Sequence, residues 1–245
     1  MRLRLLTMNV QNDEGDPRRA GLLNAELRRL DPDVVTFQEV CYPDRRDHLA
    51  ELTAGTGLRH TTHQAGVLHH RLPEADRYGG TAVATRWPHR VVDVVEHRPT
   101  GPGDVHWWTL AVVVDRPDAG ELLLITPTTP WQPEAAIARE RQAAGIVDLA
   151  ARHGTGRPTI VAGDLNAESG AASVRLLTAH YRDAWAEAGD GPGHTWSDGE
   201  PRRIDYVLAG PGTGIRSARL VADRPVDGIR LSDHAGVLVD LQLGA

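Results

Sequence analysis

An apolar run that ends in two polar residues is the strongest chemical signal in the sequence. Residues 160–162 read Ile-Val-Ala and predict a short buried strand, which ends at Gly163. Asp164 and Asn166 therefore follow the carboxyl end of a strand, where α/β proteins commonly keep their chemistry. If the chain stays extended, both side chains point to one face, where they could hold a water and a phosphoryl oxygen. Gly-Asp-x-Asn is also good turn chemistry, so this motif alone leaves both interpretations open.

Other strand ends in the chain carry similar polar residues. Asn9 and Glu39 each follow a short apolar run. Asp205 lies at the start of a predicted strand, and residues 232–234, which read Ser-Asp-His, precede the last one. Turns alone hardly explain five polar strand tips. We therefore expect these residues to meet in one site.

The order and spacing of these polar residues at strand ends resemble the motifs of the endonuclease/exonuclease/phosphatase superfamily, the DNase I-like hydrolases. The marks of that family are an early Asn, a Gln-Glu, a Gly-Asp-x-Asn, an Ile-Asp and a terminal Ser-Asp-His, and the resemblance covers roughly residues 2–242. It implies a single domain over residues 1–245 with an α/β (α+β) fold. The expected fold is a four-layer α/β/β/α sandwich, in which two mixed β-sheets pack face to face with helices outside.

The resemblance implies a phosphoric-ester hydrolase, that is, a phosphodiesterase, phosphatase or nuclease, that depends on Mg²⁺ or Mn²⁺. It assigns Glu39 as the main metal ligand, helped by Asn9 and Asp233. Carboxylate and amide oxygens suit such hard cations. The set requires no cysteine or histidine ligand, which weighs against zinc.

The same resemblance assigns the catalytic groups. Asp164 would position and deprotonate the attacking water, and Asn166 would hold this water or a phosphoryl oxygen. His234 would donate hydrogen bonds to the phosphoryl oxygens. Asp205 is expected to hold His234 in its tautomer, although a salt bridge from Asp205 to Arg203 is an alternative. Tyr78, in a stretch that resembles the family's aromatic-Gly-x-x-apolar strand, completes the catalytic set.

One position departs from the family. Many relatives carry Thr-His-Leu before the long helix, and this histidine assists the leaving group; here Thr128 stands at that position. A hydroxyl cannot deliver a proton at neutral pH. The alternative function is therefore a catalytically altered or decayed member that serves as a binding or accessory protein, or in a non-hydrolytic biosynthetic step. Thr128, Arg203 and Arg77 are the candidates for substrate contact.

Composition limits the function further. The chain of 245 residues is 40% hydrophobic, which is enough for a sizeable core. Cys41 is the only cysteine, so an intrachain disulfide is impossible. The net charge of -6 is not typical of a general nucleic-acid binder, and it favours a small or lipid-like phosphoester over nucleic acid. The sequence has neither a signal peptide nor an apolar run of 18 residues, so we expect a cytoplasmic protein with no membrane span.

Periodicity predicts the remaining elements. A helix is expected to start at Asp16-Pro17, a second one within residues 42–57, and a long one over residues 133–151. Residues 91–95, 106–114 and 121–126 predict a β-meander, with one of Trp107 and Trp108 in the core and the other exposed. Residues 58–77 have the least regular pattern. Their four histidines, His60, His63, His69 and His70, match no zinc spacing and are interpreted as solvated loop residues.

Overall fold

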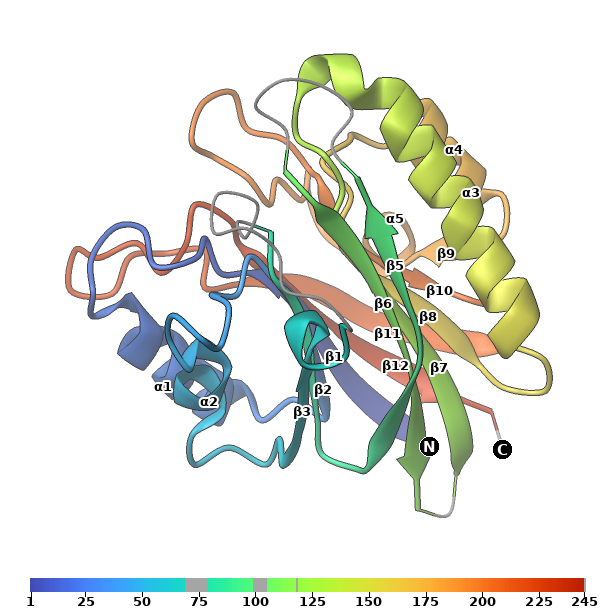
Figure 1. Ribbon diagram of the computed structural model, residues 1–245, viewed down its shortest axis with the longest axis horizontal. Helices are drawn as coiled ribbons and strands as arrows, with labels where there is room; N and C mark the ends of the chain where they lie inside the picture. Colours follow the sequence, from blue (N-terminus) through green and yellow to red (C-terminus); the bar gives the residue numbers. More distant parts are fainter. Residues whose placement is uncertain (69–78, 99–104, 118, 245) are drawn as a thin grey trace.

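The computed structural model describes residues 1–68, 79–98, 105–117 and 119–244, which form two six-stranded mixed sheets (Figure 1). The first sheet has the order β11-β12-β1-β2-β4-β3. Its strands are β1 (Arg2–Asn9), β2 (Val34–Gln38), β3 (His60–His63), β4 (Thr81–Thr85), β11 (Thr213–Val221) and β12 (Gly236–Leu243). The second sheet has the order β5-β6-β7-β8-β10-β9. Its strands are β5 (His89–His97), β6 (Trp107–Arg116), β7 (Gly120–Pro127), β8 (Thr159–Asp164), β9 (Arg182–Asp183) and β10 (Asp205–Ala209).

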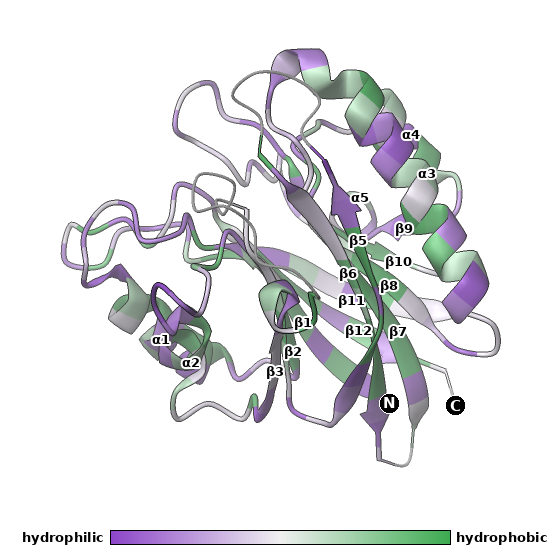
Figure 2. Ribbon diagram, viewed as in Figure 1, coloured by the Kyte–Doolittle hydropathy of each residue, from purple (hydrophilic) through white to green (hydrophobic). Residues whose placement is uncertain are grey.

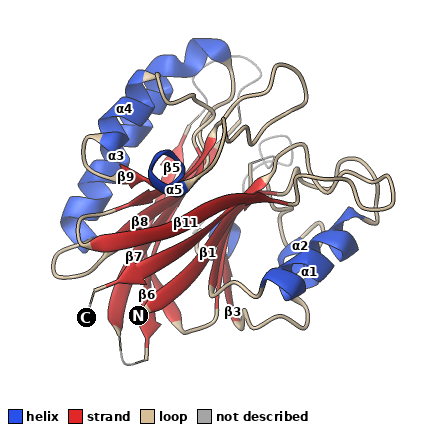
Figure 3. Cartoon of the chain, turned by 180° about the vertical axis from the view of Figure 1, so that it is seen from behind, coloured by secondary structure: helices blue, strands red, loops and turns tan. Residues whose placement is uncertain are grey.

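Helices cover the outer face of each sheet. α1 (Arg19–Leu30) and α2 (His48–Thr53) pack on the first sheet, whereas α3 (Ala136–His153) and α4 (Ala172–Thr178) pack on the second. The view from behind shows these helices on opposite sides of the paired sheets (Figure 3). The short α5 (Ala184–Ala188) and two 3-10 turns, η1 (Gln64–Gly66) and η3 (Pro133–Ala135), complete the described elements. The predicted four-layer sandwich is confirmed.

The core lies between the sheets and beneath each helical layer. Leu3 and Leu5 of β1 point inward and share a buried cluster with Leu124 of β7 and Ile160 of β8. Apolar colouring accordingly runs along the strands in the middle of the molecule, while the helices show apolar and polar sides (Figure 2). Burial of apolar surface, at about 25 cal/mol per Å², is the main force that holds such layers together.

Three local predictions were wrong. α1 begins at Arg19 rather than at Pro17, because the Asp16 carboxylate accepts a hydrogen bond from the Arg18 backbone N–H and makes a local turn there. Trp107 and Trp108 are both buried, since β6 is covered on both of its faces. His63 is not a solvated loop residue either: it belongs to β3 and is only 5% exposed.

Within the described residues, no helix is long and apolar enough to cross a membrane.

Candidate active site

The polar strand tips meet because of the direction in which their strands run. β1 and β2 are parallel neighbours, so Asn9 lies beside Gln38 at the same end of the first sheet. β10 runs antiparallel to β8, which places Asp205, the first residue of β10, opposite Asp164, the last residue of β8. β12 likewise runs antiparallel to β1, so residues just before β12 lie near the end of β1. All five tips are therefore at one edge of the sandwich.

Asn9 lies at the centre of this edge. Its amide Nδ2 donates hydrogen bonds to Glu39 Oε1 and to Asp164 Oδ2, both at 3.0 Å. Asn9 belongs to the first sheet and Asp164 to the second, so the bond between them joins the two sheets. Asn12 Nδ2 donates to the second Glu39 oxygen, Oε2, at 3.2 Å. Two carboxylates are thus held on either side of one amide group.

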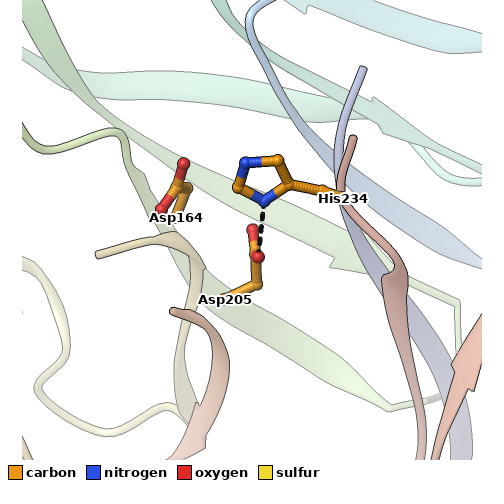
Figure 4. Close-up of side chains that lie close together, drawn as sticks. All are labelled: Asp164, Asp205 and His234. Carbon is orange, nitrogen blue, oxygen red and sulfur yellow. Dashed lines mark hydrogen bonds and ion pairs between the residues drawn. The ribbon is translucent and has the colours of Figure 1, made fainter. Parts of the chain in front are cut away.

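Asp205, the first residue of β10, and His234, in the loop before β12, form a second pair in this site. His234 Nδ1 lies 2.8 Å from Asp205 Oδ2, and both side chains are buried (Figure 4). The alternative partner, Arg203, instead forms an ion pair with Asp183 at 2.7 Å. Ser232 holds the loop in place, because its hydroxyl accepts from the His234 backbone N–H at 3.1 Å and donates to the Asn9 carbonyl at 2.8 Å. Its hydrogen bonds therefore tie the loop before β12 to the end of β1.

Burial and charge shift the pKa values in this site. Burial, reinforced by the charge of Asp205, raises the pKa of Asp164 to about 8. Burial alone would lower the pKa of His234, but the charge and hydrogen bond of Asp205 and the charges of Asp164 and Asp233 outweigh it and raise this pKa to about 10. Burial also raises the pKa of Glu39. Burial is the main cause of both raised carboxyl pKa values, and neighbouring negative charge adds to it.

The donor set fits a hard divalent cation. Asp164, Asp205 and His234 offer ligand atoms that all lie within 4.8 Å of one another. Asp205 Oδ1 is buried and has no hydrogen-bond partner among the described residues. Glu39 and Asn9 add oxygens next to Asp164. Oxygen-rich sets of this kind, with carboxylates in excess, are what Mg²⁺ and Mn²⁺ prefer.

The Asp164 and Asn166 side chains meet, although not by the predicted extended geometry. Asn166 has a left-handed φ of 43°, so the strand does not continue through it. Instead, the Asn166 backbone N–H donates to Asp164 Oδ1 at 2.8 Å, which makes a tight turn, and its side-chain Nδ2 donates to Asp164 Oδ2 at 3.2 Å. The turn interpretation of Gly-Asp-x-Asn is therefore confirmed, and the site interpretation stays a prediction.

The other predicted site residues lie in different surroundings. Thr128 lies next to Asp164 in a parallel bridge, but it is fully buried, and its hydroxyl is 2.9 Å from the Thr81 hydroxyl. Arg203 points to Asp183, and its guanidinium stacks 4.6 Å from the Tyr206 ring. Asp233 is partly exposed, and its backbone N–H donates to Gln11 Oε1 at 3.1 Å. Tyr78 and Arg77 lie outside the described residues.

Sequence reasoning missed three residues that support the site. Asn12 binds Glu39, and the Thr129 carbonyl accepts a hydrogen bond from Asn166 Nδ2 at 2.8 Å. The Thr195 hydroxyl accepts from the backbone N–H groups of Ile204 and Asp205, both at 3.1 Å, and so fixes the start of β10. Asn12 carried a signal as an amide residue close behind a polar strand tip, and Thr195 carried one because Thr195-Trp196 resembles the family's Thr-aromatic pair.

Comparison with known proteins agrees with this fold. The sequence model of the Endonuclease/Exonuclease/phosphatase family matches residues 6–234. No curated protein sequence matches the chain. A solved endonuclease/exonuclease/phosphatase from Beutenbergia cavernae is 26% identical, with a TM-score of 0.76 over 100% of this chain and 72% of that one. One from Bacteroides vulgatus is 19% identical, with a TM-score of 0.77 over 100% of both chains. The human Nocturnin catalytic domain with bound sulfate is 18% identical, with a TM-score of 0.75 over 99% of this chain and 94% of that one.

Proposed function

Because the chain belongs to the endonuclease/exonuclease/phosphatase family, we propose that it is a phosphoester hydrolase that depends on Mg²⁺ or Mn²⁺. The observation that carries this proposal is the Asn9 amide, which lies between the Glu39 and Asp164 carboxylates at 3.0 Å from each. This arrangement keeps a candidate metal ligand and a candidate base side by side. Glu39, Asn9 and Asp233 would hold the cation, which would polarise a phosphoryl oxygen and offset its charge.

The chain's own residues would supply the proton chemistry. Both Asp164 oxygens accept hydrogen bonds, and the raised pKa of Asp164 would make it a stronger proton acceptor than an ordinary aspartate. Asn166 would orient that water next to Asp164. The Asp205 carboxylate binds Nδ1 of His234, which leaves Nε2 to donate a hydrogen bond to a phosphoryl oxygen. His234 is protonated at neutral pH, since its pKa is about 10, so it can also compensate charge that develops on the phosphoryl group.

The substrate is proposed only as a phosphoester. The sulfate bound to human Nocturnin shows that one structural relative accepts a tetrahedral oxyanion. The net charge of -6 is the argument for a small or lipid-like ester rather than nucleic acid. Thr128, Arg203 and Arg77 remain proposed contacts, although the first two are engaged by Thr81 and Asp183 within the protein. Tyr78 remains a proposed catalytic group, and the cytoplasm remains the proposed location.

A metal-dependent screen over phosphomonoesters, phosphodiesters and plasmid DNA tests the proposal.

Glu39→Gln should keep the fold and lose most Mn²⁺ binding in calorimetry. Asp164→Asn should lower turnover by roughly 10²–10⁴-fold, as is typical when a general base is lost. Asp148→Asn, an exposed carboxylate on α3, is the matched control and should change neither. Unchanged Mn²⁺ affinity of Glu39→Gln would refute the metal assignment. An absence of turnover on every ester would favour the accessory-protein alternative.

A further inference from the structure

The chain turns sharply immediately after β2, at Glu39. Glu39 has a left-handed φ of 55°, a conformation that is unfavourable for a residue with a side chain. Such conformations persist only where the surroundings hold them in place. The position of the Glu39 carboxylate therefore depends on whatever fixes the backbone that follows it.

Polar contacts hold both the carbonyl and the N–H of each of the two peptide groups that follow Glu39. In the first, the Glu39 carbonyl accepts from the Asn12 N–H at 2.8 Å, and the Val40 N–H donates to the Gly80 carbonyl at 2.9 Å. In the second, the Val40 carbonyl lies 3.3 Å from His63 Nε2, and the Cys41 N–H donates to His48 Nδ1 at 3.4 Å. Two histidine side chains from separate elements, β3 and α2, thus hold the second peptide group.

The protonation state of His63 suits this role. Burial lowers its pKa to about 4, so the ring is neutral at neutral pH. His63 Nδ1 accepts a hydrogen bond from the Ala65 N–H at 3.1 Å, which leaves the proton on Nε2, where it can be donated to the Val40 carbonyl. The ring also packs edge-on against Tyr42, with 5.1 Å between centroids.

The space around this peptide group is tight. A Cβ atom at Gly80 would overlap the Val40 carbonyl oxygen and would lie 2.7 Å from His63 Nε2. Val40, Cys41, His48 and His63 are all buried, so water cannot replace a lost histidine partner. Loss of either imidazole would leave a buried backbone group without its partner, two residues or fewer from Glu39.

We propose that His48 and His63 are positioning residues that hold the peptide group between Val40 and Cys41 and thereby fix the Glu39 carboxylate for divalent-cation binding. This inference rests on the proposed role of Glu39 as a metal ligand. It assigns a function to two histidines that do not contact the cation themselves. Supporting groups of this kind commonly change metal affinity by about 10–100-fold when they are removed.

The test is Mn²⁺ affinity, measured by calorimetry beside a thermal melt of each metal-free variant. His63→Leu and His48→Leu should each weaken Mn²⁺ binding by about tenfold or more. His63→Gln, which retains a donor near the position of Nε2, and His48→Asn, which retains an acceptor near Nδ1, should recover much of the loss. His89→Leu is the control: His89 bonds to the Thr62 and Thr85 hydroxyls at the far end of β4, so it should lower the melting temperature without weakening Mn²⁺ binding.

The outcomes separate this inference from the proposed function. Mn²⁺ affinity that is unchanged in folded His63→Leu and His48→Leu, while Glu39→Gln has lost binding, would overturn the inference and leave the proposed metal site standing. If Glu39→Gln also binds Mn²⁺ normally, the metal site and the inference both fail. If the leucine variants do not fold, the conservative variants His63→Gln and His48→Asn decide. Wild-type Mn²⁺ affinity in both of them, together with weak Mn²⁺ binding by Gly80→Ala, would support the inference. Weak Mn²⁺ binding by the conservative variants would overturn it.

Discussion

The charge of His234 depends on the carboxylate behind it. Asp205 contributes both a hydrogen bond and a negative charge, and these are the strongest effects that raise the pKa of His234 against the opposing effect of burial. A buried histidine without such a partner would be neutral at pH 7. The proposed interaction of His234 with phosphoryl oxygens therefore depends on Asp205 as well as on His234.

We predict that Asp205→Asn lowers the pKa of His234 from about 10, because the amide removes the charge while it retains a similar shape. The measurement is a titration of the His234 ring protons by NMR. Asp183→Asn is the control, since Asp183 pairs with Arg203 and has no bond to the ring. A His234 pKa that is the same in the wild type and in Asp205→Asn would show that the pair does not set the charge.

The grouping of the candidate site residues could be predicted from the sequence only in part. The polar types and their order at the strand ends were enough to group Asn9, Glu39, Asp164, Asp205 and His234 in one site. The left-handed conformations of Glu39 and Asn166 were not predictable, because they are stabilised by partners distant in sequence. The Thr128 hydroxyl was expected to face the site, but its bond to Thr81 depends on the packing of β4 against the second sheet, which no local pattern reveals.

At the scale of elements, the site depends on how closely β7 and β8 approach each other. Gly163 precedes Asp164 in β8, and a Cβ atom there would overlap the Pro127 carbonyl oxygen at the end of β7. Side chains larger than hydrogen would therefore push the end of β8, and with it the candidate base, away from its neighbour.

Gly163→Ala should destabilise the protein by about 1–3 kcal/mol, the usual cost of overpacking a well-packed site. At this chain length each kcal/mol lowers the melting temperature by roughly 2–4 °C. Gly145→Ala is the matched control: it lies within α3 with no atom near its missing Cβ, and it should stabilise by about 0.5–1 kcal/mol through helix propensity. Equal melting temperatures of the two variants would mean that β7 and β8 separate without cost.

Apolar runs predicted most strands and helices because a sandwich buries one face of each element, and the pattern of buried residues follows that geometry. The failures have the same cause. Trp107 and Trp108 alternate in direction, yet β6 lies under other elements on both faces, so alternation does not separate buried from exposed residues there. His63 lies in an edge strand that is polar in sequence, and contacts with residues distant in sequence, such as Val40 and Tyr42, contribute to its burial.

At the scale of the whole molecule, buried neutral histidines make stability depend on pH. Burial lowers the pKa values of His48, His63, His89 and His97 to about 4. Between pH 6.5 and about 4 the unfolded chain binds protons at these four positions and the folded chain does not, so stability is lost as pH falls through this window. Asp164 and Glu39 act in the opposite direction, because burial raises their pKa values in the folded state, but they are two groups against four.

We predict that the free energy of unfolding of the metal-free protein is clearly lower at pH 5 than at pH 7, by on the order of 1–2 kcal/mol for each of these histidines. Urea unfolding at the two pH values measures the difference. His89→Gln should reduce the difference by the share of one histidine, whereas His180→Gln, at an exposed position, should leave it unchanged. A protein that is more stable at pH 5 than at pH 7 would contradict the prediction.

The pairing of β1 with β12 also governs when the site can exist. β1 is the first strand of the chain and β12 the last, and they lie side by side with Arg2 opposite Gln242. During synthesis β1 can pair with β2 early, but its other edge stays open until the final strand leaves the ribosome. Asp233 and His234 come just before β12, so this carboxylate and this imidazole are synthesised after the other residues of the candidate site. The candidate site can therefore be complete only after β12 has paired with β1.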